Sequence, residues 1–221
     1  MNSDRKNTLF AMARRSVSIR VHPCHLLMAV ALSTLAACAQ PAPPRDNFYR
    51  LDALPQVGAL DKAVLPGVVE VGRLDVDGVL SERGLAYQAA DGALARYSYD
   101  LWSDAPATAL QLALAETLQA AHVADAVVTP DLRVPPDWAV RGRLYRFEYL
   151  PDSAKVVVRM QLAAVSARDG TLVLLETYGA EPPVQGSGPE AAVAALSRAT
   201  ADIFARFVRD LSNAKVPVQR R

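Results

Sequence analysis

The chain has 221 residues, of which 51% are hydrophobic, and its 24 basic and 23 acidic side chains give a net charge of +1. This balance provides no basic patch of the kind that binds nucleic acid, so nucleic acid is excluded as a partner. Three histidines and two cysteines offer little for metal ligation, thiol chemistry or histidine-based catalysis.

The first 37 residues have the order of charge and hydrophobicity of a secretory signal. Arg14, Arg15 and Arg20 precede an apolar run over residues 26–37. A helix over this run spans about 18 Å, whereas the hydrocarbon core of a bilayer is about 30 Å thick, so the run is predicted to be a signal and not a spanning anchor. Met12 offers an equally good start, which leaves the true N-terminus open.

The apolar run ends in Leu35-Ala36-Ala37-Cys38, which resembles the bacterial lipobox. Small residues fit the narrow subsites of a signal peptidase, and the thiol of Cys38 is the nucleophile that receives a diacylglyceryl group. We therefore predict a lipoprotein signal peptide over residues 1–37 and a lipid anchor, of the palmitate type, on Cys38. The alternative is an ordinary signal peptide, in which Cys38 has no role.

The residue after Cys38 favours the periplasmic face of the outer membrane as the destination. Ala39 stands where an Asp retains lipoproteins in the inner membrane in the familiar enterobacterial sorting pattern. Three acyl chains at about 0.8 kcal/mol per buried methylene contribute on the order of 30 kcal/mol, so the attachment is permanent in practice.

The mature chain is expected to fold as one domain that is held together by packing alone. Cys24 leaves with the signal and Cys38 is acylated, so no disulfide can form. Removal of the signal also takes away five basic residues and one acidic residue, which changes the net charge from +1 to −3.

Residues 38–46 are predicted to be a tether, because their prolines supply no hydrogen bonds to a helix or sheet. Strands are predicted over residues 48–51 and 68–76. Asp91-Gly92 predicts a hairpin, and the strand that follows it alternates apolar Tyr97 and Tyr99 with polar neighbours.

The second half of the chain predicts two helices and an antiparallel meander. Apolar residues at helical spacing predict a helix over residues 106–122, and a longer stripe after Pro189 predicts the last helix. The strands between them are predicted over residues 138–150, 155–165 and 171–178. We therefore predict one compact α/β domain over residues 47–213, with a mixed, largely antiparallel sheet, two main helices packed on it, and a frayed tail over residues 214–221.

No residue of the mature chain is predicted to be catalytic, and no metal or cofactor is expected. His122 is the only histidine after Cys38, and it lies at the expected end of a helix, where a surface role is favoured. Asp75-Val76-Asp77-Gly78 begins like a calcium loop, but the later ligands are absent at the required spacing. The chain is expected not to be an enzyme, and a lipid hydrolase is the least favoured alternative.

Taken together, the lipobox, the proline-rich tether, Phe48-Tyr49-Arg50-Leu51 and the strand end Tyr97-Ser98-Tyr99-Asp100-Leu101-Trp102 resemble the ABC-type transport auxiliary lipoproteins. The resemblance covers essentially the whole mature chain. Ser103-Asp104-Ala105-Pro106 departs from it, because an acidic residue is expected directly after the tryptophan.

The resemblance implies a non-enzymatic subunit beside an ATP-driven lipid transporter. Its implied partners are a mammalian-cell-entry type substrate-binding protein, the ABC permease and ATPase, and the membrane, and further copies of the chain are allowed for. Tyr97, Tyr99 and Trp102 are named as the candidate partner surface, but plain core packing under the sheet is the favoured interpretation of these three residues. The alternative function is an envelope assembly or structural lipoprotein that binds another outer-membrane protein or peptidoglycan.

Overall fold

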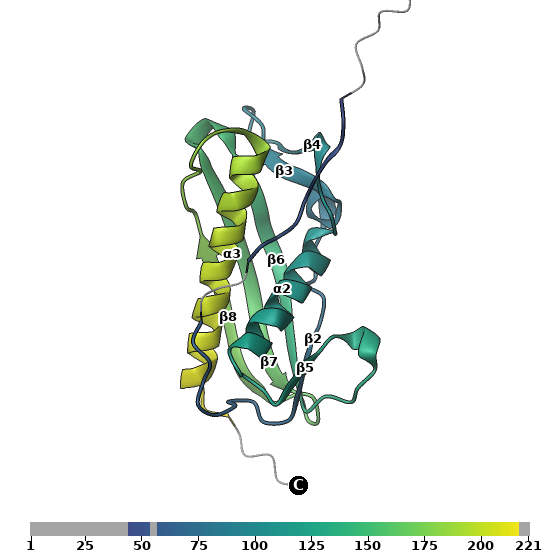
Figure 1. The fold of residues 1–221 in the computed structure, drawn as a ribbon, viewed down its shortest axis with the longest axis vertical. Coiled ribbons are helices and arrows are strands. Elements are labelled where there is room, and N and C mark those ends of the chain that lie inside the picture. Colours follow the sequence, from purple (N-terminus) through teal and green to yellow (C-terminus); the bar gives the residue numbers. More distant parts are fainter. Residues whose placement is uncertain (1–43, 54–56, 217–221) are drawn as a thin grey trace, which may run out of the picture. The chain divides into compact units, whose positions relative to one another are not determined.

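A computed structural model describes residues 44–53 and 57–216, which belong to one compact unit. Two helices lie on the same face of an eight-stranded sheet (Figure 1). The predicted signal peptide, Cys38, the first part of the predicted tether and residues 217–221 of the predicted tail lie outside the described residues.

The sheet is built around three long antiparallel strands. They are β6 (Trp138–Leu150), β7 (Lys155–Ser166) and β8 (Leu172–Ala180), in which β7 pairs with both of its neighbours. The turn between β6 and β7 ends at Ala154, whose φ of 48° lies in the left-handed region. Apolar side chains alternate along β7, because successive residues of a strand point to opposite faces.

The other edge of β6 is shared by two strands that run parallel to it. The five remaining strands are β1 (Asn47–Tyr49), β2 (Val68–Val71), β3 (Gly84–Gln88), β4 (Leu94–Trp102) and β5 (Ala126–Val128). The start of β6 pairs with β2, and its end pairs with β3. Beyond them, β5 is parallel to β2, β4 is antiparallel to β3, and β1 is parallel to β4.

Both helices begin at prolines that the sequence places in their first turn. Helix α2 spans Pro106–Ala120, and helix α3 spans Gly188–Asn213 with Pro189 as its second residue. A proline there costs no hydrogen bond, because the first amides of a helix have no partner within it. Short 3-10 turns connect other elements: η1 (Gly78–Ser81), η2 (Pro130–Leu132) and η3 (Pro151–Ser153).

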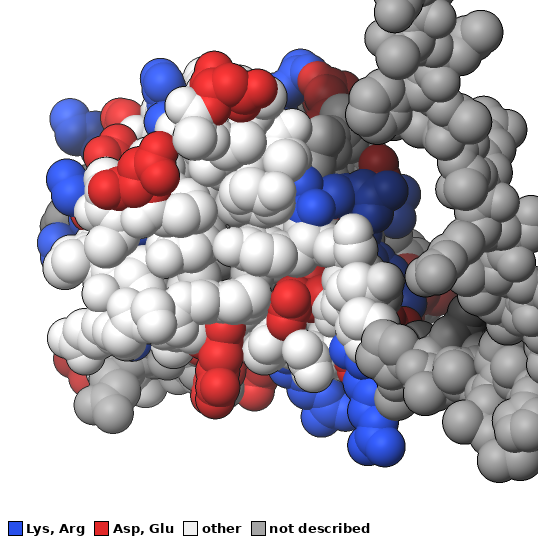
Figure 2. Space-filling view, turned by 90° about the horizontal axis from the view of Figure 1, so that it is seen from above, with Lys and Arg blue, Asp and Glu red and all other residues white. Residues whose placement is uncertain are grey.

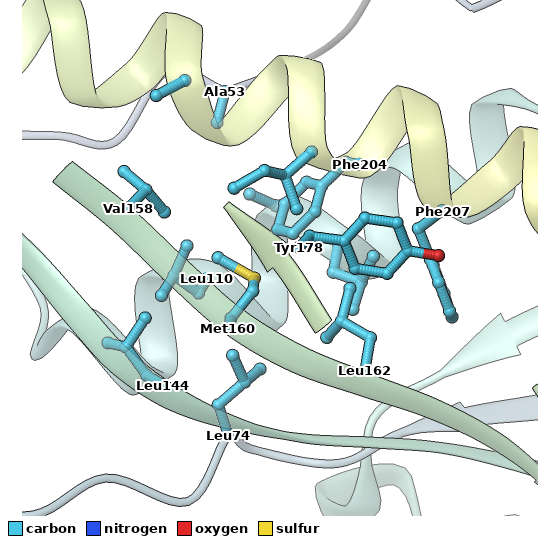
Figure 3. Close-up of a cluster of buried hydrophobic side chains, with 14 of the residues drawn as sticks. Ala53, Leu74, Leu110, Leu144, Val158, Met160, Leu162, Tyr178, Phe204 and Phe207 are labelled. Carbon is cyan, nitrogen blue, oxygen red and sulfur yellow. The ribbon is translucent and has the colours of Figure 1, made fainter. Parts of the chain in front are cut away.

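The core lies between the sheet and the two helices, as Figure 3 shows for Met160 and Leu162 of β7 beside Phe204 and Phe207 of α3. These four side chains are essentially inaccessible to solvent. A buried polar contact joins α2 to the sheet, since Gln111 Nε2 donates a hydrogen bond of 2.8 Å to the backbone oxygen of Val71. Burial without that bond would cost free energy.

The predicted fold class is confirmed by the mixed sheet and the two helices on it. The long meander strands and α2 agree with their predicted ranges to within three residues at each end. The second predicted strand is wrong in length, because β2 ends at Val71. Beyond it the chain contacts β6 through the Gly72 amide, which donates a hydrogen bond to the Val140 oxygen, and through an isolated bridge between Asp75 and Arg143. Strand β5 was not predicted.

Candidate functional site

The first strand joins the tether to the domain. Strand β1 pairs with β4 in parallel, with Asn47 opposite Asp100 and Tyr49 opposite Trp102. It is the outermost strand on that side of the sheet. The chain reaches β1 from the end of the domain at which the β3–β4 hairpin lies (Figure 1). The segment that precedes β1 therefore enters the domain at this end.

Asp100 fixes β1 to the sheet through two side-chain hydrogen bonds. Its Oδ1 accepts one from Asn47 Nδ2 and one from the Tyr49 hydroxyl, both at 3.0 Å. Partial burial and the adjacent Asp100 carboxylate raise the pKa of Tyr49 to about 12, with a smaller contribution from Glu190. Tyr49 therefore stays protonated, and a donor, at neutral pH.

Trp102 does not lie on a surface. Only 2% of the residue is accessible, and its ring centroid lies 5.4 Å from that of Phe147 in the core. Trp102 is therefore a core residue, in agreement with the favoured interpretation of the sequence, and it is not part of an accessible surface. The reason is that β1 and β4 place Tyr49 and Trp102 side by side toward the core.

Tyr97 and Tyr99 have different environments although both belong to β4. Tyr97 is partly buried against the core, and its ring centroid lies 4.5 Å from that of Tyr87. Burial, followed by the neighbouring Tyr149, raises the pKa of Tyr97. Tyr99 is 45% exposed. The three predicted residues thus do not form one surface, and only Tyr99 presents a large accessible face.

Phe48 was overlooked as a surface residue. It is 56% exposed, and the guanidinium carbon of Arg83 lies 5.3 Å from the centroid of its ring. The Nε of Arg83 also donates a 2.9 Å hydrogen bond to the backbone oxygen of Trp102, which fixes the arginine beside β1. Phe48 and Tyr49 are adjacent in a strand, so one of them must face away from the core. This alternation of side chains is the feature of the sequence from which an exposed residue in this strand could have been predicted.

The end of the domain near β1 has an uncharged centre. Figure 2 views the molecule from this end and shows uncharged residues over the middle of the surface, with acidic and basic side chains at its margin. The connections here include the hairpin at Asp91-Gly92, the turn at η3 and the segment before Gly188, all rich in small residues.

The other features singled out in the sequence do not form a second candidate site within the described residues. His122 is exposed with a φ of 53°, and its Nδ1 lies 3.1 Å from the backbone oxygen of Leu60. Within residues 44–53 and 57–216, no cluster of three or more His, Cys, Asp or Glu side chains could hold a metal ion. No helix in the same ranges has the length and hydrophobicity to span a membrane.

Comparison with known proteins places the chain among envelope lipoproteins. Residues 49–207 match the family model described as "ABC-type transport auxiliary lipoprotein component", which confirms the resemblance seen in the sequence. Curated protein sequences give no significant match.

Two solved structures share the fold at low identity. A Xanthomonas campestris protein assigned to the DUF330 family model superposes with a TM-score of 0.62 at 14% identity, covering 73% of this chain and 92% of that chain. An uncharacterized protein superposes with a TM-score of 0.60 at 19% identity, covering 76% and 99%. A weaker likeness, with a TM-score of 0.44 at 15% identity, is to the PelC dodecamer from Paraburkholderia phytofirmans, covering 71% and 92%.

Proposed function

The chain belongs to the ABC-type transport auxiliary lipoprotein family, and on this premise we propose that it is a non-enzymatic, lipid-anchored subunit of an ABC-type lipid transport system. The observation that carries the proposal is the family match over residues 49–207, which begins within β1 and runs into α3. Membership of a lipoprotein family places the protein at a membrane of the cell envelope.

The proposed location is the periplasmic face of the outer membrane, with the anchor on Cys38. Ala39 supports this destination, and eight residues lie between Cys38 and Asn47, the first residue of β1. A short connection keeps the domain within a thin layer above the bilayer, which raises its effective concentration toward any partner that reaches that layer. The proposed partner is the mammalian-cell-entry type subunit, which brings lipid across the periplasm from the ABC permease and ATPase.

Co-purification tests the proposal. The mature chain from Cys38, with a C-terminal tag, is used to capture the recombinant mammalian-cell-entry type subunit of the same organism. We expect a complex that survives size-exclusion chromatography, and deletion of the gene is expected to disturb envelope lipid balance. Absence of the complex, together with unchanged lipid balance, would overturn the proposal and favour an envelope structural lipoprotein that binds peptidoglycan or another outer-membrane protein.

A further inference from the structure

We propose that the β1–β4 edge of the sheet is a membrane-contact surface that places Phe48 and Tyr99 in the headgroup region of the bilayer. The inference rests on the proposed function in one respect only, which is that the chain is anchored through Cys38. It adds an orientation of the domain on the membrane and assigns residues to the contact.

Exposed hydrophobic side chains gather on these two strands. Phe48 of β1 is 56% exposed, and Tyr99 of β4 is 45% exposed. Phe48 lies opposite Leu101 in the strand register, and Tyr99 precedes Leu101 by two residues, a spacing that keeps side chains on one side of an extended strand. Because β1 is the outermost strand, this surface is accessible from the side of the sheet.

The length of the tether determines what can cover this surface. Asn47 is the ninth residue after Cys38, and a chain of nine such steps spans at most about 32 Å when fully extended. Phe48 is the residue after Asn47, so it cannot move farther than about this distance from the acylated cysteine. The bilayer is therefore always within reach of the β1–β4 edge.

The positively charged side chains around Phe48 are complementary to the phosphate groups of a lipid headgroup layer. Arg45, Arg50 and Arg83 are exposed, and Arg83 stacks on the Phe48 ring. Aromatic rings are enriched at the headgroup level of membranes, and arginine stems lie along apolar surface while their guanidinium groups reach phosphate oxygens.

Two nearby carboxylates already have partners within the domain. Asp100 accepts hydrogen bonds from Asn47 and Tyr49. Glu82 forms an ion pair of 2.8 Å with Arg96. Asp46 is exposed and is the acidic side chain closest in sequence to Phe48 that faces solvent. Since the contact is intramolecular once the chain is anchored, a weak interaction is sufficient to orient the domain.

Depth-dependent fluorescence quenching tests the inference. The mature chain is coupled through its single thiol at Cys38 to a maleimide lipid in vesicles of phosphatidylethanolamine and phosphatidylglycerol, with or without brominated acyl chains. Phe48→Trp adds a reporter to a chain whose own tryptophans, Trp102 and Trp138, are 2% and 1% exposed. If the ring at position 48 lies at the boundary of headgroups and acyl chains, brominated lipid is expected to quench about half of the fluorescence that the new tryptophan adds.

Leu132→Trp is the matched control, because Leu132 is also an exposed hydrophobic residue, at 60%, but belongs to η2 and not to the β1–β4 edge. Its emission is expected to be unchanged by brominated lipid. Tyr99→Trp provides a second reporter should Phe48→Trp fail to fold. Equal quenching at positions 48 and 132, or no quenching at positions 48 and 99, would overturn the inference.

The inference would also be overturned if, in solution without vesicles, the tryptophan at position 48 were shielded from solvent and the protein had twice the mass of one chain. A second copy would then cover the surface. Chemical coupling makes the result independent of lipoprotein processing and of transport. A failure of the proposed function therefore leaves this test intact, and a failure of this test leaves the proposed function standing.

Discussion

The hydroxyl of Tyr49 donates a 3.0 Å hydrogen bond to the carboxylate of Asp100, 51 residues further along the chain. This bond and the one from Asn47 attach the first strand of the domain to the strand that leads into Trp102. The attachment of the segment before β1 to the domain is thus specified by side chains as well as by backbone pairing.

Tyr49→Phe is expected to lower the free energy of unfolding by about 1 kcal/mol, because it removes one hydrogen bond and leaves an Asp100 lone pair less satisfied. Urea denaturation of the mature chain measures the change. Tyr99→Phe is the matched control, since the Tyr99 side chain is 45% exposed. Equal stability of the two variants would contradict the role assigned to the Tyr49 hydroxyl.

Stability is expected to fall at alkaline pH in part through Tyr49. Its pKa rises from 10.0 in the unfolded chain to about 12 in the fold, so the proton is held more tightly when the chain is folded. The resulting stabilisation is complete below pH 10.0 and is lost as the pH rises toward 12. The difference in unfolding free energy between wild type and Tyr49→Phe should therefore shrink over this range. A difference that stays constant with pH would refute the assignment.

Gly142→Ala is expected to cost about 2 to 3 kcal/mol through overpacking at the centre of the sheet. A Cβ atom there would overlap the backbone oxygen of Gln161 and would lie 2.8 Å from Cδ2 of Leu162. Gly179 of β8 is the control, because its added Cβ would meet its nearest atom, the Val158 oxygen, at 3.9 Å. Thermal denaturation of both variants checks the contrast, and similar melting temperatures would show that the contact at Gly142 relaxes freely.

Two leucines of α2 allow the contribution of burial to stability to be distinguished from that of helix propensity. Leu110→Ala is expected to cost about 3 kcal/mol, because its side chain is fully buried and leaves a cavity. Leu112→Ala, two residues later and 51% exposed, should change stability by less than about 0.5 kcal/mol. Urea midpoints of the two variants give the measurement. Comparable losses would mean that the outer face of α2 is covered in the folded protein.

Cys38→Ser is expected to release the domain from the membrane without unfolding it. Membrane fractionation with labelled palmitate measures the anchor, and circular dichroism of the released chain measures the fold. Cys24→Ser, within the predicted signal, is the matched control and should leave acylation unchanged. A Cys38→Ser variant that remained in the membrane fraction and kept its label would disprove the anchor prediction.

The sequence was sufficient for those elements whose pattern is local. Strands β6 and β7 could be located because they are long, at 13 and 12 residues, and are bounded by turn residues, and α3 because its apolar stripe repeats over several turns. Strand β5 could not, since it has three residues and exists only by pairing with β2, more than fifty residues earlier.

The same difference between local patterns and contacts distant in sequence explains which residues of the candidate site could be predicted. That one of Phe48 and Tyr49 faces outward follows from alternation, but which one does so depends on pairing with β4 far along the chain. The partner of Trp102 in the core could not be identified from its own neighbourhood, because Phe147 is contributed by β6. An arginine such as Arg83, which stacks on Phe48 from a segment 35 residues away, leaves no local pattern.

The pairing of β1 with β4 also bears on how the domain responds to a pull on the segment that precedes it. When the anchor is pulled away from the domain along the axis of β1, the force runs along the strand and across its hydrogen bonds to β4. Those bonds are then loaded in shear and must fail together, whereas a pull perpendicular to the strand would open them one at a time. A pull along this axis on the segment before β1 is therefore opposed by all of the β1–β4 hydrogen bonds at once.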